Sequence, residues 1–87
     1  MNELLPAMLF SAATKAGVFA CEIGRPQPTD EQTAEMNRLA RQPLTILAEG
    51  LPDRELTLDE LEDLDAAIEG VAQGVVLRVL GPPVGVN

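Results

Sequence analysis

The 87-residue sequence has no histidine, no tryptophan and no tyrosine, and it contains one cysteine and two phenylalanines. Without histidine, the chain lacks the side chain that most often transfers protons near neutral pH, and it lacks a common zinc ligand. The single cysteine, Cys21, excludes a disulfide within the chain, and we interpret it as a small buried apolar side chain. These absences argue against catalysis and against a zinc site.

Other signatures of chemistry are also missing. Ser11, Thr14 and Cys21 have no base beside them in the sequence, and there is no glycine-rich phosphate or dinucleotide loop. An EF-hand calcium loop that begins at Asp59 would need glycine at its sixth position and glutamate at its twelfth. The chain has Leu64 and Gly70 at these positions. We therefore predict that the protein is not an enzyme and that it has no catalytic residue, cofactor, metal site or small-molecule ligand.

Positive charge is scarce, with 6 lysines and arginines against 14 acidic residues and a net charge of −8. Residues 49–69 contain nine acidic residues and one base, Arg54, so this segment alone carries nine minus one, or eight, negative charges. Such a balance repels the phosphates of nucleic acids and anionic membrane surfaces. It favours a basic protein partner or simple solubility, so we expect no direct nucleic-acid binding.

A long uninterrupted apolar run is absent too. The N-terminal run from Leu4 to Ala20 contains Lys15, and it is short of the ~20 apolar residues that a membrane span needs. A signal peptide requires basic residues before its apolar run, and none precedes this one. The segment from Val18 to Cys21 only faintly resembles a lipoprotein cleavage box. We expect no membrane association and a cytoplasmic location, or a virion location if a phage encodes the chain.

The N-terminal apolar residues follow helical spacing and predict a helix over residues 3–16, with Gly17 just past its end. This helix is apolar on most sides, so we expect it to be buried in the core or against another subunit. Residues 18–23 are compatible with a short strand or with a longer helix. The following connector, residues 24–28, contains two prolines that favour an extended chain.

A second helix is predicted to begin at Thr29 or Asp30, with acidic residues early and arginines later, as the helix dipole favours. Proline has no backbone N–H and disfavours a helical residue before it. We therefore predict that this helix stops or kinks near residues 41–42, before Pro43, and that residues 44–48 form a further helical segment closed by Gly50.

The strongest local signal is the segment Thr57-Leu58-Asp59-Glu60, which matches a capping box at the start of a third helix. The other end of this helix is open to two interpretations. Glycines in its second half weaken a helix, and residues 75–80 are rich enough in β-branched side chains to form a strand. Residues 81–87 are predicted to be a non-helical tail.

The whole pattern predicts one small domain over residues 1–87 of the mainly α class. We expect a bundle of about three helices, with the extended Pro/Gly connector 24–28 and the C-terminal tail 81–87. The alternative is an α+β domain with short strands near residues 18–23 and 75–80.

Two candidate surfaces lie on the third predicted helix. One is an acidic outer face, interpreted as a partner-binding surface or as a solubilising one: Asp59, Glu62, Asp63 and Glu69. The other combines an apolar seam at 3-4-3-4 spacing with a stripe of small residues at every fourth position, for packing within the chain or for self-association. Its members are Leu61, Leu64, Ala66, Ile68, Gly70, Val71, Gly74 and Val75.

These features favour a non-catalytic protein–protein interaction or structural subunit of a larger assembly, of phage or bacterial origin. Its partner would be a second protein or further copies of itself, as in a homo-oligomer. The alternative hypothesis is a small acidic inhibitor or regulator, such as a nucleic-acid mimic or an anti-activator, that occupies a basic groove on a target protein. Reversal of the acidic charges to lysine would separate the two hypotheses.

Overall fold

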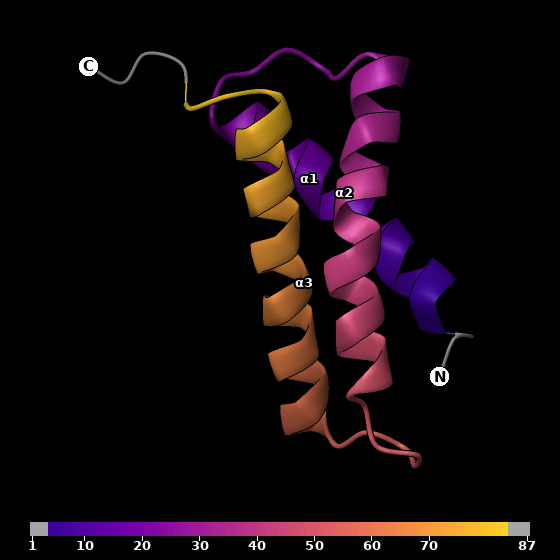
Figure 1. The fold of residues 1–87 in the computed structure, drawn as a ribbon. Helices are drawn as coiled ribbons and strands as arrows, with labels where there is room; N and C mark the ends of the chain where they lie inside the picture. The colour runs from indigo at the N-terminus through magenta and orange to yellow at the C-terminus, as the bar shows by residue number, and fades with distance from the viewer. Residues whose placement is uncertain (1–3, 84–87) are drawn as a thin grey trace.

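The computed structural model describes residues 4–83, and in that range it contains three α-helices and no strand. The helices are α1 (Leu5–Glu22), α2 (Asp30–Glu49) and α3 (Leu58–Val79). α2 and α3 run antiparallel, and α1 packs across this pair and contacts both (Figure 1). The predicted mainly α bundle of three helices is confirmed, and the α+β alternative is wrong.

The first helix is longer than predicted, because it continues through Gly17 to Glu22 instead of ending at residue 16. The segment 18–23 is therefore not a strand. Ala20 is buried, so the core extends the helix past the glycine. The next residue, Cys21, faces away from the core and is exposed, so the predicted burial of its side chain is wrong. The helix ends in a Schellman motif, in which Gly24 has φ +80° and the Arg25 N–H donates to the Ala20 carbonyl at 2.9 Å. Residue 3 of the predicted helix lies outside the described residues.

The predicted stop of the second helix before Pro43 is wrong, since α2 continues through Pro43 to Glu49 and is closed by Gly50 as predicted. Thr29 is its N-cap: the Thr29 hydroxyl accepts from the Gln32 N–H at 3.1 Å, and the Gln32 side chain accepts from the Thr29 N–H at 3.0 Å. Beyond the proline, Leu44 and Ala48 are buried on the same core-facing line as the first half of the helix. Burial of that second half outweighs the local penalty of the proline.

α3 begins after its N-cap, Thr57, and remains helical to Val79, so the predicted strand at 75–80 is wrong. Val75 and Val76 are both buried, which favours one continuous helix over the local preference of β-branched residues for strands. The helix ends at Gly81, which has φ +95° and donates its N–H to the Leu77 carbonyl at 3.1 Å. Of the predicted tail, residues 84–87 lie outside the described residues.

The core follows one line of buried residues along each helix, with a repeat of about four residues. Half of its twelve members are alanine, which allows helix backbones to approach closely but buries little area per residue. The buried residues are Met8, Ala12, Ala16 and Ala20 on α1, Met36, Ala40, Leu44 and Ala48 on α2, and Ile68, Ala72, Val75 and Val76 on α3.

One contact joins the connector after α1 to the end of α3. The Arg25 guanidinium donates from Nε and Nη2 to the Pro82 carbonyl, at 3.1 Å and 2.8 Å. An added Cβ at Gly81 would lie 2.9 Å from Arg25 Nη2, a contact that the flexible arginine side chain can relieve, so the positive φ is the main requirement for glycine here. This clamp fixes the end of the bundle opposite the loop between α2 and α3.

Candidate interaction surface

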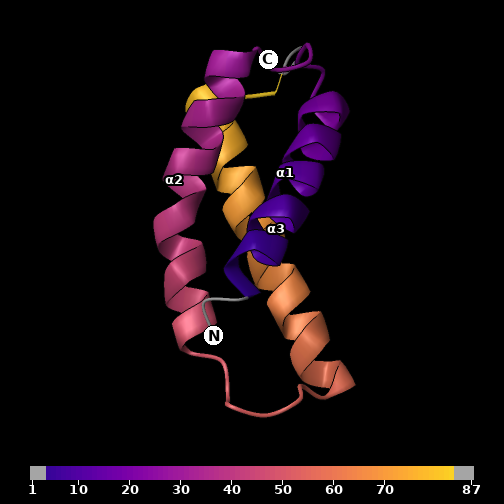
Figure 2. The ribbon, with the colours of Figure 1, turned by 90° about the vertical axis from the view of Figure 1, so that its right-hand side faces the viewer.

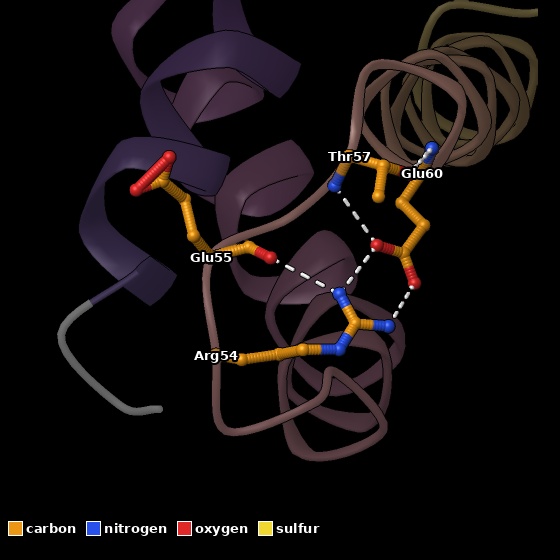
Figure 3. Close-up of polar contacts among 4 residues, drawn as sticks. All are labelled: Arg54, Glu55, Thr57 and Glu60. Atoms are coloured by element: carbon orange, nitrogen blue, oxygen red, sulfur yellow. Dashed lines mark hydrogen bonds and ion pairs between the residues drawn. The ribbon is translucent and has the colours of Figure 1, made fainter.

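The start of α3 is fixed by a network of charged hydrogen bonds in the loop between α2 and α3 (Figure 3). Both terminal nitrogens of Arg54 donate hydrogen bonds to the Glu60 carboxylate, at 2.8 Å each. Its Nη1 also donates to the Glu55 carbonyl at 3.0 Å. The Glu60 carboxylate accepts from the Thr57 N–H at 2.9 Å, which completes the predicted capping box. Arg54 first, and then the Thr57 amide, lower the pKa of Glu60 from 4.5 to about 2. Glu60 is therefore engaged within the chain.

The predicted acidic face, Asp59, Glu62, Asp63 and Glu69, is exposed at all four positions. The four carboxylates are not gathered at one hollow. Glu62 and Glu69 line a shallow hollow on α3, whereas Asp63 lines a different one between α2 and α3. A fifth acid on this helix, Asp65, forms an ion pair with Lys15 of α1 at 2.9 Å. The acidic face is thus distributed over two sides of α3.

The predicted seam on α3 divides into buried and exposed parts. Ile68 and Val75 are buried, and Leu64 and Val71 are half-buried against the core, whereas Leu61 is 46% exposed. Sequence reasoning missed two further core members, Ala72 and Val76, which extend the seam at spacings of four residues.

The predicted stripe of small residues, Ala66, Gly70 and Gly74, lies on the exposed side of α3. A Cβ added at Gly70 or Gly74 would meet no atom within 4 Å. The two glycines of the stripe therefore make no close contact with another helix among residues 4–83. The alanines of the core lines serve that purpose instead.

Two exposed leucines mark the N-terminal part of α3. Figure 2 shows that the first turns of α3 extend past the N-terminal end of α1, toward the loop that joins α2 to α3. In this part Leu58 is 78% exposed, and with Leu61 it lines the shallow hollow that contains Glu62 and Glu69. We call this surface the leucine–acid patch, and its members are Leu58, Leu61, Glu62, Asp65, Ala66 and Glu69.

A further exposed apolar side chain, Phe10, lies on α1. Phe10 is 76% exposed, although the sequence predicted a buried first helix. It lines a hollow between α1 and α2 that also contains two arginines, of which Arg38 is ion-paired to Glu35 at 2.6 Å. We call this surface the arginine groove, and its members are Leu9, Phe10, Ala13, Ala34, Asn37, Arg38 and Arg41.

The sequence contains a signal for the exposed position of Phe10. The buried residues of α1 recur every fourth position from Met8, and Phe10 is two residues from Met8 and from Ala12. Two residues correspond to about 200° of helical rotation, so Phe10 lies on the opposite side of the helix from that line. On α2, the spacing of Arg38 and Arg41 similarly places them on one face.

Residues 4–83 contain no group of three or more metal-binding side chains and no buried polar or charged side chain. A hollow of about 430 Å³ between α1 and α2 has an alanine-rich wall, and its one charged side chain, Arg25, is bonded to the Pro82 carbonyl. None of the described helices combines the length and apolarity needed to cross a membrane.

Comparison with protein-family models, with curated proteins and with solved structures finds no match to this chain. The exposed surfaces of the molecule are therefore the features that indicate its function.

Proposed function

We propose that this protein is a non-catalytic subunit that acts by binding other protein chains within a larger assembly. The observation that supports this proposal is the exposure of Phe10 and Leu58, each more than three-quarters accessible, in hollows lined by charged side chains. Burial of one such side chain at an interface contributes about 1.5–3 kcal/mol, and the surrounding charges select the partner.

The composition of the core supports the same proposal. A domain of this length buries only about 60–65% of the surface of its unfolded chain, so it gains stability from contacts with other chains. Half of the buried residues here are alanine, which adds little apolar area. The large apolar side chains outside the core are available to supply further burial on assembly.

The proposal is tested by the molar mass of the purified protein, measured by light scattering at tens of micromolar, and by its co-purification from the native host. We expect a mass above that of the 9.3 kDa chain, or a stoichiometric partner. Phe10→Ser or Leu58→Ser should reduce this association. Val18→Ser is the matched control, because Val18 is 55% exposed on α1 and lines neither surface. A strictly monomeric protein without a co-purifying partner would contradict the proposal.

A second candidate function is an acidic inhibitor that binds a basic groove on a target protein. The exposure of Asp59, Glu62, Asp63 and Glu69 favours it. Reversal of three of these carboxylates to lysine should abolish binding to the target, and binding by the unchanged chain should weaken strongly with salt. If the reversals leave binding unchanged, the acidic face only keeps the protein in solution.

A further inference from the structure

The two most exposed of the large apolar side chains in residues 4–83 have surroundings of opposite charge. Phe10 lies in the arginine groove beside Arg38 and Arg41, whereas Leu58 lies in the leucine–acid patch beside Glu62 and Glu69. Each surface therefore offers an apolar anchor and the counter-charge that the other lacks. This complementarity identifies a partner already present in every preparation of the protein, which is a second copy.

We propose that the arginine groove of one copy binds the leucine–acid patch of the next, so that the chain assembles head to tail. This inference rests on the proposed function and adds to it the identity of one partner and the surfaces that meet. Phe10 of one copy packs against Leu58 and Leu61 of the other. Arg41 then pairs with the carboxylates that border those leucines.

The two surfaces do not cover each other within one copy, because Phe10 and Leu58 are each more than three-quarters exposed and the two hollows share no residue. The arginine groove is formed by α1 and α2 without α3, and the leucine–acid patch is formed by α3 alone. Both belong to one packed bundle, so their contact joins different copies. An interface between two unlike surfaces is heterologous, and it produces a closed ring or an extended chain of copies.

The net charge of −8 per copy does not prevent this contact. At physiological salt the Debye length is about 8 Å, so exposed charges far from the interface are largely screened. Residues 49–69 hold that excess charge, and the arginine groove contains none of them. The local pairing of arginine with carboxylate therefore makes the electrostatic interaction at the interface attractive.

The test uses two variants that each lose one surface. The groove variant carries Phe10→Ser and Arg41→Glu, and the patch variant carries Leu58→Ser and Glu62→Lys. All four positions are exposed, so circular dichroism and the melting temperature should show folded proteins. Loss of an apolar anchor together with a repulsive charge should weaken self-association of each variant by at least about a hundredfold. A control variant carries Val18→Ser and Arg78→Glu, which remove an exposed apolar side chain and a positive charge outside both surfaces.

Mixing the two variants gives the decisive measurement. The patch variant retains an intact groove and the groove variant retains an intact patch, so an equimolar mixture should form a 1:1 complex in sedimentation or light scattering. Two separate monomers in the mixture would overturn the inference, as would equal loss of association in the control variant. If the unchanged protein is monomeric but retains a different partner, the inference fails while the proposed function stands. A protein with neither self-association nor any partner would contradict both.

Discussion

The continuity of α2 through Pro43 leads to an unusual expectation, in which removal of a partly buried residue stabilises the protein. Pro43 is the fourteenth of the 20 residues of α2, and it has no N–H to donate to the Leu39 carbonyl one turn earlier. We expect Pro43→Ala to raise the free energy of unfolding, because alanine restores the hydrogen bond and removes the clash of the ring with that carbonyl.

The magnitude follows from three contributions. Proline in a helix interior costs about 3 kcal/mol relative to alanine. Against this, alanine makes the unfolded chain more flexible, which costs about 0.4–1 kcal/mol, and the half-buried ring loses about 0.5–1 kcal/mol of apolar burial. The net gain is about 1–2 kcal/mol, which corresponds to a rise of about 4–16 °C in melting temperature for a domain of this size.

Urea unfolding followed by circular dichroism measures this change, with Pro6→Ala as the matched control. Pro6 lies in the first turn of α1, where proline is tolerated, so its replacement should not stabilise the protein and should cost only about 0.4–1 kcal/mol, from the added flexibility of the unfolded chain. If Pro43→Ala is neutral or destabilising at an unchanged m-value, the reasoning about a continuous α2 is refuted.

Three further substitutions test the core and the two ends of α3. Leu44→Ala should cost about 3–5 kcal/mol in urea unfolding, because Leu44 is fully buried, whereas Ile46→Ala, 62% exposed on the same helix, should cost less than about 0.5 kcal/mol. Gly81→Ala should lower the free energy of unfolding by about 1–2 kcal/mol, because it forces a left-handed conformation on alanine. Glu60→Gln should lower the melting temperature at pH 7, because glutamine retains the capping acceptor but loses the charge that pairs with Arg54.

The last prediction has a defined pH dependence. The pKa of Glu60 in the folded protein is lowered from 4.5 to about 2. The charge of Glu60 therefore stabilises the fold fully above pH 4.5, and this contribution is lost as the pH falls through about 2. The difference in melting temperature between Glu60→Gln and the unchanged protein should therefore shrink between pH 5 and pH 2. A constant difference over that range would refute the role of the ion pair, and equal effects of Leu44→Ala and Ile46→Ala would refute the assigned core.

The sequence predicted what local chemistry determines, including three helices, the start of α3 at Thr57 and the exposure of its acidic face. It failed where tertiary packing overrides local preference, at Gly17, at Pro43 and in the segment after Val75. In each case buried residues beyond the weak point, such as Ala20 and Leu44, keep the chain helical.

The candidate surfaces were less predictable for a different reason. The acidic positions could be assigned to the outside of one helix from spacing alone. The arginine groove required the packing of α1 beside α2. The exposed Leu58 is the first residue of α3, whose first turns extend past the end of α1 (Figure 2). Such relations between helices that are distant in sequence are not encoded in the periodicity of any single one.

The alanine lines of the core have a consequence for how this protein can change through evolution. At Ala48 and Ala72, which are buried and line none of the hollows described above, every replacement except glycine adds atoms to closed space, and overpacking costs about 1–3 kcal/mol per site. Glycine would instead weaken the helix by about 1 kcal/mol. Mutational drift is therefore confined mainly to the solvent-facing positions. Descendants of this chain would conserve small residues at these two closed positions, while the alanines that border the hollow and the exposed positions diverge.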